Sequence, residues 1–404
     1  MVRPSRMRSW LIFVALSVVT GSFSVAVDAH IITAASTSLK DVTAASSAAG
    51  NGDTVMIPAG KSMWSGTLSV TKPITLKGAG GNVTVLMKSG VMISCALRVD
   101  APMRITGIGF ENSTIDHSSL IIAGKKAKGA NGPIRQLRID HCRFVLGKRA
   151  IAANGWVEGV IDHNSFINCN IAIGITGDND ASWGRPIEPG SIHTICIENN
   201  KFTIDNSTPR EPNQQIYLQE GGRATVRHNT FDSTAYTKGN GIFLDSHGNW
   251  PVKGRNYDDP VQYRGQPLLE VYNNVFHAHH TYDFSDYRGG TVFAYNNRFI
   301  YDAGGKPNVF KLKEEEAWAA RFAPVRTMWP AKDQIVNGHF WGNTLNGEPI
   351  TKIDIYSAAD EVFIQEARDF WQSPPSANTG SPPGRYFPYT PLAYPHPAVR
   401  ADNF

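Results

Sequence analysis

Three short phrases in the second half of the chain carry acids and bases at alternating positions. They are IFLDSHG (242–248), YDFSDYRGG (282–290) and VFKLK (309–313). If each phrase is a strand and the strands stack about 4.8 Å apart, their outward side chains form one wall. We expect a column along this wall made of Gln219, Asp245, Asp283 or Ser285, and Lys311. At its edge we expect Glu220, Arg223, His247, Asp286, Arg288 and Lys313.

Acids, bases and cations on one wall suit β-elimination at a uronic acid residue. A cation must neutralise the sugar carboxylate, a base must remove the neighbouring proton, and an acid must protonate the leaving oxygen. We assign catalysis to Arg288, His247, Lys311 and Asp245. We assign substrate binding to Gln219, Glu220, Arg223, Trp250 and Lys313.

A calcium ion is one way to supply the cation, because Ca²⁺ binds several carboxylate oxygens at once. The candidate ligands are Asp245, Asp283 and Asp286. The run HAHH (277–280) also invites a metal interpretation, but adjacent histidines in a loop seldom form a closed site.

Two other functions stay open. Paired carboxylates, Asp245 with Asp283 or Asp286, could hydrolyse a glycosidic bond instead. A third class is a β-helix that binds polysaccharide or a surface without catalysis.

The same residues have structural interpretations. Asp245 and His247 stand where turn-forming side chains are common, and Arg288 could bond carbonyls at a corner or pair with Glu270. Three tryptophans lie between the expected strands and could stack on sugars or simply pack: Trp183, Trp250 and Trp318.

The elements that must position this wall are indicated by a repeated phrase. It recurs as DHCRF (140–144), DHNSF (162–166), ENNKF (198–202), RHNTF (227–231), YNNVF (272–276), YNNRF (295–299) and WGNTL (341–345). The closest copies are about 22 residues apart, and longer intervals indicate inserted loops.

Each copy predicts a strand, a corner and a second strand. The fifth and seventh residues before the Phe are mostly apolar, as in Leu137 and Ile139, which is the alternation of a strand with one face inward. We expect the Asn two before the Phe to sit at the corner, where Asn tolerates tight turns and its amide can bond the next copy. The Phe then fills the interior.

Stacked units of this kind predict an all-β fold, a single-domain right-handed parallel β-helix over residues 30–364. The stretch 37–49 predicts a helix that caps the first coil. The tail 365–404, rich in proline and aromatic residues, is expected to pack irregularly along the coils.

The remaining properties restrict where the protein acts. Arginines followed by an apolar run and small residues make 1–29 a signal peptide, so we expect a secreted or periplasmic protein. No later segment predicts a membrane span. A net charge of +4 without basic clusters gives nucleic acid binding no support. We expect a monomer that binds an acidic polysaccharide, with Cys95, Cys142, Cys169 and Cys196 as buried free thiols.

Three phrases resemble a known family. GDTVMIPAGKSMW…ITLKGAG, EVYNNVF…RGGTVFAYNNRF and the closing YTPLAYPHP are similar to secreted bacterial members of the pectin-lyase-like β-helix superfamily. The resemblance covers nearly all of the mature chain and implies the fold. The superfamily includes polysaccharide lyases, glycosidases and phage-type depolymerases, so it does not choose the reaction. The Gly-Asp-Asp pair and the Arg-Ile-Lys motif typical of its glycosidase branch are not present in this sequence.

Overall fold

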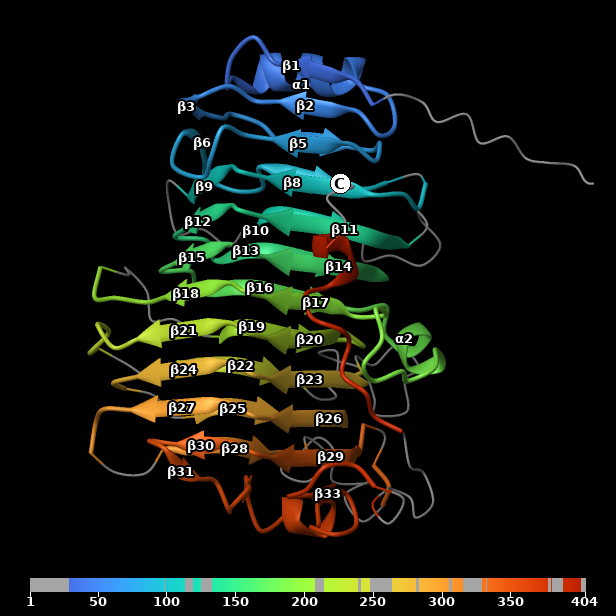
Figure 1. The fold of residues 1–404 in the computed structure, drawn as a ribbon, viewed down its shortest axis with the longest axis vertical. Helices are drawn as coiled ribbons and strands as arrows, with labels where there is room; N and C mark the ends of the chain where they lie inside the picture. The colour runs from blue at the N-terminus through green and yellow to red at the C-terminus, as the bar shows by residue number, and fades with distance from the viewer. Residues whose placement is uncertain are drawn as a thin grey trace, which may run out of the picture.

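Each coil of the chain contributes one strand to each of three sheets, and the coils stack into a right-handed parallel β-helix (Figure 1). This confirms the predicted fold. The computed structural model describes residues 29–97, 99–112, 119–124, 133–207, 214–238, 241–247, 264–280, 283–304, 307–314, 329–331, 333–376, 379 and 388–400. The predicted signal peptide therefore lies almost wholly outside the described residues.

The three sheets are named A, B and C here. Sheet A contains β1 (Ile31–Thr33), β2 (Thr54–Met56), β5 (Thr75–Lys77), β8 (Met103–Thr106), β11 (Ile134–Asp140), β14 (Val157–Asp162), β17 (Ile195–Glu198), β20 (Arg223–Arg227), β23 (Leu268–Tyr272), β26 (Gly290–Tyr295), β29 (Ile335–Trp341) and β33 (Phe370–Trp371). Sheet B contains β3 (Gly60–Met63), β6 (Thr84–Lys88), β9 (Gly109–Asn112), β12 (Arg143–Val145), β15 (Ser165–Ile167), β18 (Lys201–Thr203), β21 (Thr230–Ser233), β24 (Val275–Ala278), β27 (Arg298–Tyr301), β30 (Thr344–Leu345) and β31 (Glu348–Pro349). Sheet C contains β4 (Leu68–Val70), β7 (Ile93–Cys95), β10 (Ser119–Gly124), β13 (Arg149–Asn154), β16 (Ile171–Thr176), β19 (Gln214–Gln219), β22 (Ile242–Ser246), β25 (Asp283–Tyr287), β28 (Asn308–Leu312) and β32 (Asp354–Ile355).

The repeated Phe builds the interior, as predicted. Successive rings stack with centroids 4.4 to 5.1 Å apart, close to the spacing of neighbouring strands. The stacked residues are Phe110, Phe144, Phe166, Phe202, Phe231, Phe276 and Phe299. The apolar residues of sheet A, such as Leu137 and Ile139, are buried against them.

The repeated Asn forms a buried ladder at the corner between sheets A and B. The side-chain amide of Asn200 donates to Oδ1 of Asn229 at 3.1 Å, and Asn229 donates to Asn274 at 3.0 Å. Each rung also satisfies backbone groups, since Oδ1 of Asn229 accepts from the backbone N–H of Asn200 and its Nδ2 donates to Ile197 O. The bond to the next copy is therefore confirmed.

The tight-turn geometry belongs to the residue before the ladder Asn, which corrects one detail of the prediction. That residue has positive φ in copy after copy: His141, His163, Asn199, His228, Asn273 and Asn296. Asn and His tolerate this left-handed conformation better than most side chains. The ladder Asn is then free to turn its amide inward.

The first coil is capped by α1 (Leu39–Ala48), which agrees with the predicted helix. The Ser38 side chain accepts from the backbone N–H of Asp41, satisfying one donor of the first turn. Val42 and Ala45 face the core below. Near the other end lies a short turn of 3₁₀ helix, η2 (Asp360–Val362).

Residues 388–400, called the strap here, run along the outer face of sheet A and end in α4 (Pro397–Arg400), as Figure 1 shows in red. Charged side chains of the sheet hold it. Arg138 donates to Ala398 O at 3.0 Å, Glu198 accepts from the His396 N–H at 2.9 Å, and Tyr389 donates to Glu270 at 2.7 Å. Residues 388–400 of the predicted tail therefore pack along the coils, whereas residues 370–371 of the same predicted tail form β33 and pair with β29 of sheet A.

The four cysteines are buried and unbridged, as predicted. No helix among the described residues has the length and apolar character needed to cross a membrane.

We expect Asn229→Ala to lower the free energy of unfolding by roughly 2–4 kcal/mol. The change removes an acceptor from Asn200 and leaves Ile197 O without its donor. Urea unfolding measures the loss. Thr230→Ala, at an exposed site one residue on, is the matched control and should change stability by less than about 0.5 kcal/mol. Equal stability of the two variants would show that the asparagine ladder does not contribute to the free energy of unfolding.

The strap should loosen in acid because of His396. This ring is buried, and its Nε2 has no hydrogen-bond partner among the described residues. Burial lowers the pKa of His396 to about 4. The unfolded chain then binds more protons between pH 6.5 and 4, so stability falls as pH falls, by roughly 2 kcal/mol between pH 6.5 and 5.

Urea unfolding at several pH values tests this dependence. Burial also lowers the pKa of His339 to about 4, so His396→Gln should remove part of the slope and not all of it. His30→Gln changes an exposed ring with only a 3.5 Å contact to Asp53, so it should alter the slope less than His396→Gln does. A slope that survives intact in His396→Gln would place the acid sensitivity elsewhere.

Candidate functional site

The strands of sheet C place an acid–base column on the outer face, as the sequence predicts, but in a partly different register. Tyr217 of β19 pairs with Asp245 of β22, Asp245 with Asp286 of β25, and Asp286 with Lys311 of β28. The column is therefore Tyr217, Asp245, Asp286 and Lys311.

The prediction that Asp283 or Ser285 stands in this column is wrong. Ser285 pairs with Leu244 and Phe310, which face inward, so Ser285 is buried and donates to Val309 O. Asp283 pairs with Asn308, nearer the start of the strands. A shift of one residue exchanges the two faces of a strand, which is why Asp286 takes the place between Asp245 and Lys311.

Asp245 is the anchor of the cluster. Its Oδ2 lies 2.8 Å from His247 Nδ1 and accepts from Gln214 Nε2 at 3.0 Å, while Oδ1 lies 3.4 Å from Arg288 Nη2. His247 and Arg288 come directly after their strands, at the corner that leads into sheet A. The predicted alternative of an Arg288–Glu270 pair is not formed, because Glu270 lies on sheet A and accepts from Tyr389 of the strap.

The other two carboxylates are held by cations. Asp286 bonds to Lys313 and lies 3.4 Å from Arg288, which therefore bridges two coils. Asp283 binds Lys311 and accepts from Asn308 at 2.9 Å. The ring of Tyr356 lies beside both lysine ammonium groups, at 4.8 Å from Lys313 and 5.8 Å from Lys311.

The two central carboxylates have opposite electrostatic environments. Burial tends to raise the pKa of Asp245, but Arg288 and His247 outweigh it and hold that pKa at about 2. Burial raises the pKa of Asp286, helped by the negative charge of Asp245 and opposed by Lys313. Asp245 is consequently the firmly ionised partner.

Burial sorts the cluster into two layers. The carboxyl groups of Asp245 and Asp286 have no exposed surface, whereas 19% of His247, 14% of Lys311 and 10% of Arg288 remain accessible. Nitrogen-bearing side chains therefore face outward over a layer of negative charge.

Two residues that sequence reasoning missed complete this face. Tyr217 lies with its ring 4.9 Å from His247, edge to face, and its hydroxyl donates to Gln219. Arg149 of β13 reaches the Tyr217 ring from the other side, 5.9 Å from its centroid. In the phrase IYLQEGGR, Tyr217 stands two residues before Gln219, the residue predicted for the column. Gln219 pairs with Thr176 of β16, at the end of the strand.

The predicted calcium ligands do not fit a metal site. The described residues contain no group of three His, Cys, Asp or Glu side chains placed to hold a metal ion. Asp245, Asp283 and Asp286 each contact a histidine, arginine or lysine nitrogen, and these cationic partners offset the negative charge that would attract Ca²⁺. In the HAHH run, His277 pairs with Asp302 at 2.8 Å on sheet B, away from the wall.

Arg223 lies in a separate pocket, so the structure does not bring it to the wall. It begins β20 of sheet A, and its guanidinium donates to the carbonyls of Pro186 and Arg185. These residues belong to the segment around α2 (Asp180–Gly184), which forms one side of the pocket. Its hydrogen bonds all go to the segment around α2, which is a structural role.

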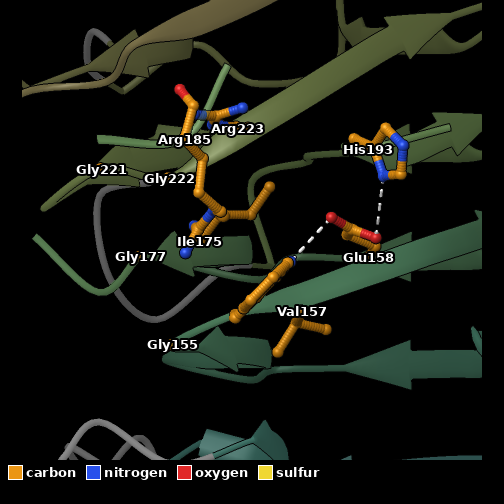
Figure 2. Close-up of a pocket in the computed structure, with 11 residues that line it drawn as sticks. Gly155, Val157, Glu158, Ile175, Gly177, Arg185, His193, Gly221, Gly222 and Arg223 are labelled. Atoms are coloured by element: carbon orange, nitrogen blue, oxygen red, sulfur yellow. Dashed lines mark hydrogen bonds and ion pairs between the residues drawn. The ribbon is translucent and has the colours of Figure 1, made fainter. Parts of the chain in front are cut away.

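Figure 2 shows this pocket, which lies at the corner between sheets C and A. Glu158 accepts from the Trp156 indole at 2.7 Å and lies 3.3 Å from His193, and the Arg185 guanidinium covers the Trp156 ring at 4.4 Å. Because Asp178 in turn binds Arg185, these groups satisfy one another.

Of the remaining predicted residues, Glu220 is buried at a positive-φ corner position. The Trp183 indole donates to Gly265 O, and its ring is covered by Arg264, so Trp183 packs. Trp250 and Trp318 lie outside the described residues.

No protein-family model matches the sequence, and no curated protein matches it. Among solved structures, the chain is similar to the alginate lyase from Paenibacillus sp. str. FPU-7, with 13% identity and a TM-score of 0.45 over 82% of this chain and 98% of that chain. It is also similar to a variant of the catalytic domain of a GH87 α-1,3-glucanase in complex with nigerose, with 9% identity and a TM-score of 0.32 over 84% of this chain and 66% of that chain. These values describe a distant likeness in backbone arrangement.

We expect Ca²⁺ to leave the melting temperature unchanged relative to a chelator. A bound ion at a hundred times its Kd would add about 2.7 kcal/mol of stability, which thermal unfolding would detect. A saturable rise with Ca²⁺ that disappears in Asp283→Asn would restore the calcium interpretation. Asp302→Asn, which changes an exposed carboxylate on the other side of the coil, is the control.

Proposed function

We propose that the protein is carbohydrate-active and cleaves an acidic polysaccharide by β-elimination at the wall of sheet C. The observation that carries this proposal is the layering of the cluster. Its carboxylates are buried, so the accessible groups that a sugar would meet are the imidazole of His247 and the cations Arg288, Lys311 and Lys313. Such a face suits a negatively charged ligand.

The cations bind and neutralise the uronate carboxylate. Proton loss next to that carboxylate places negative charge on its oxygens, and fixed cations in a partly dry site stabilise this charge more than water does. Arg288 is held by Asp245 and Asp286, and Lys311 by Asp283, so their positions are set before substrate arrives.

His247 acts as the base. Nδ1 of His247 lies 2.8 Å from the Asp245 carboxylate and 3.1 Å from Arg288 Nη1. In the tautomer in which Nδ1 donates to the shorter contact, Asp245, the lone pair is on Nε2. Nε2 takes the proton beside the carboxylate, the electron pair forms a carbon–carbon double bond, and the bond to the leaving oxygen breaks.

Tyr217 supplies the proton for the leaving oxygen. Burial raises the pKa of Tyr217, and the charge of Asp245 adds to the effect, so the phenol stays protonated at neutral pH. Its ring touches His247, so base and acid lie side by side. Each turnover then moves one proton to His247 and one from Tyr217.

A glycoside hydrolase is the second candidate, because one specific observation favours it. Asp245 and Asp286 are neighbours whose pKa values are moved in opposite directions, the arrangement expected of a carboxylate that stays ionised and an acid that donates. Against it, neither carboxyl group has accessible surface for a sugar or a water molecule.

Incubation with pectate, alginate, glucuronan and glycosaminoglycans tests the proposal. Rising ultraviolet absorbance shows the new double bond and supports elimination. New reducing ends without absorbance would overturn elimination in favour of hydrolysis, and binding without cleavage would leave a polysaccharide-binding protein.

On the substrate that responds, His247→Gln should lower kcat about a hundredfold or more, because the base is lost. Arg298→Ala, at an exposed site on β27, should retain full activity. Far-ultraviolet circular dichroism confirms that both variants are folded. Full activity of a folded His247→Gln protein would move the base elsewhere.

A further inference from the structure

Arg149 occupies an unusual position on sheet C. It begins β13, and its side chain crosses the next coil at Gly174 of β16. A Cβ built on Gly174 would lie 2.6 Å from Arg149 Nε and 2.7 Å from its Cδ, so the arginine lies directly over the glycine backbone. The guanidinium ends 5.9 Å from the centroid of Tyr217, which is on the coil after that. Gly174 and Tyr217 are register partners, so the charge of Arg149 extends the acid–base column by one coil.

Arg149 has no anionic partner in the part of the chain that the structure describes. Arginines nearby on the coils have one: Arg138 binds Asp162, Arg185 binds Asp178, and Arg288 binds Asp245. For Arg149 the structure shows only the face of an aromatic ring. Burial lowers the pKa of Arg149, and Tyr217 and Glu220 oppose this shift only in part. A half-buried charge without a counter-ion is costly, so its retention needs a ligand to explain it.

We propose that Arg149, seated over Gly174, binds the carboxylate of a second uronate residue next to the one that is cleaved. This inference rests on the proposed function and adds a subsite to it. A guanidinium offers two parallel N–H donors to a carboxylate, and no carboxylate of the described residues binds those of Arg149.

The subsite also fixes how the polymer lies relative to the axis of the β-helix. From Arg149 through Tyr217 and Asp245 to Lys311, the column rises by one strand spacing, about 4.8 Å, at every coil. A sugar chain held at both ends of this column lies parallel to the axis of the β-helix. It exposes one carboxylate to Arg149 and the next to the cluster around Arg288.

Two substitutions test the subsite independently. Arg149→Gln removes the charge. Gly174→Ala keeps the charge but places a methyl group where the arginine side chain lies, and should displace the guanidinium. Arg149→Lys keeps a charge without the two-pronged geometry. Gly304→Ala is the glycine control, because a Cβ there meets no atom within 4 Å.

Binding is measured by calorimetry in the His247→Gln background, so that the ligand is not consumed. The probes are short oligouronates from pectate, alginate and glucuronan, each compared with its carboxyl-reduced, neutral counterpart. We expect Arg149→Gln and Gly174→Ala each to weaken oligouronate binding about tenfold or more, with Arg149→Lys in between and Gly304→Ala unchanged. Binding of the neutral oligosaccharides should change little.

Three results would overturn the subsite. Unchanged oligouronate affinity in Arg149→Gln would show that the arginine only packs against Tyr217. Equal weakening for charged and neutral oligosaccharides would show that its effect is structural. Either of these two results overturns the subsite but leaves the proposed cleavage reaction of the unaltered protein unaffected. If the protein binds no oligouronate and cleaves none, the subsite and the proposed function fall together.

Discussion

The spacing between neighbouring coils governs the rest of this structure. Backbone pairing in three sheets, the stack of phenylalanine rings and the ladder of asparagine amides all require the same rise per coil, and each would fail if one coil slipped. Of the three, the ladder tolerates a change in coil spacing least. Its amides are buried, and each accepts from and donates to a specific neighbour. Coils therefore differ in length only at the corners between strands, as with the segment around α2. The outward side chains of successive coils keep a constant separation.

The wall of sheet C uses that regularity to build a charged site that would otherwise be unfavourable. Burying the carboxylates of Asp245 and Asp286 costs free energy, and their ion pairs only offset it, so the cluster is a poor source of stability. The cluster instead fixes the positions of the accessible side chains. Arg288, Lys311 and Lys313 each pair with a carboxylate of a neighbouring coil, and His247 pairs with Asp245 two residues before it. Arg288 and His247 therefore meet although more than forty residues separate Asp245 from Arg288 in sequence. Arg149 differs, since it pairs with no carboxylate among the described residues.

The repeated Asn-x-Phe phrase was sufficient to predict the fold because the residues that define the corner and the core recur in the same order. The positive-φ residue escaped notice because either His or Asn can fill it, as His163 and Asn199 do. The candidate site was less accessible to sequence reasoning. In β25, Phe284 belongs to the core and Ser285 pairs with the inward-facing Leu244, while Asp286 pairs with Asp245 in the column. Two successive residues therefore lie on the inner side, so simple alternation places the strand one residue out of register. Arg149 and Tyr217 lie in phrases that read as ordinary strands, and only the absence of a side chain at Gly174 brings them together. Arg223 shares a phrase with Gln219 but starts a different sheet, which no spacing rule reveals.

The strap also sets an order of events for the chain as it is made. Arg138 finds its partner carbonyl 260 residues later, at Ala398, and Glu198 receives a backbone N–H from His396, 198 residues on. A growing chain can stack its coils one by one from the amino-terminal cap, because each needs only its predecessor. Glu198 and Glu270 cannot meet their partners in the strap until residues 388–400 have been made. Docking of the strap therefore adds contacts of very long sequence separation to a stacking process that is otherwise local, and a chain without the strap would leave this part of sheet A uncovered.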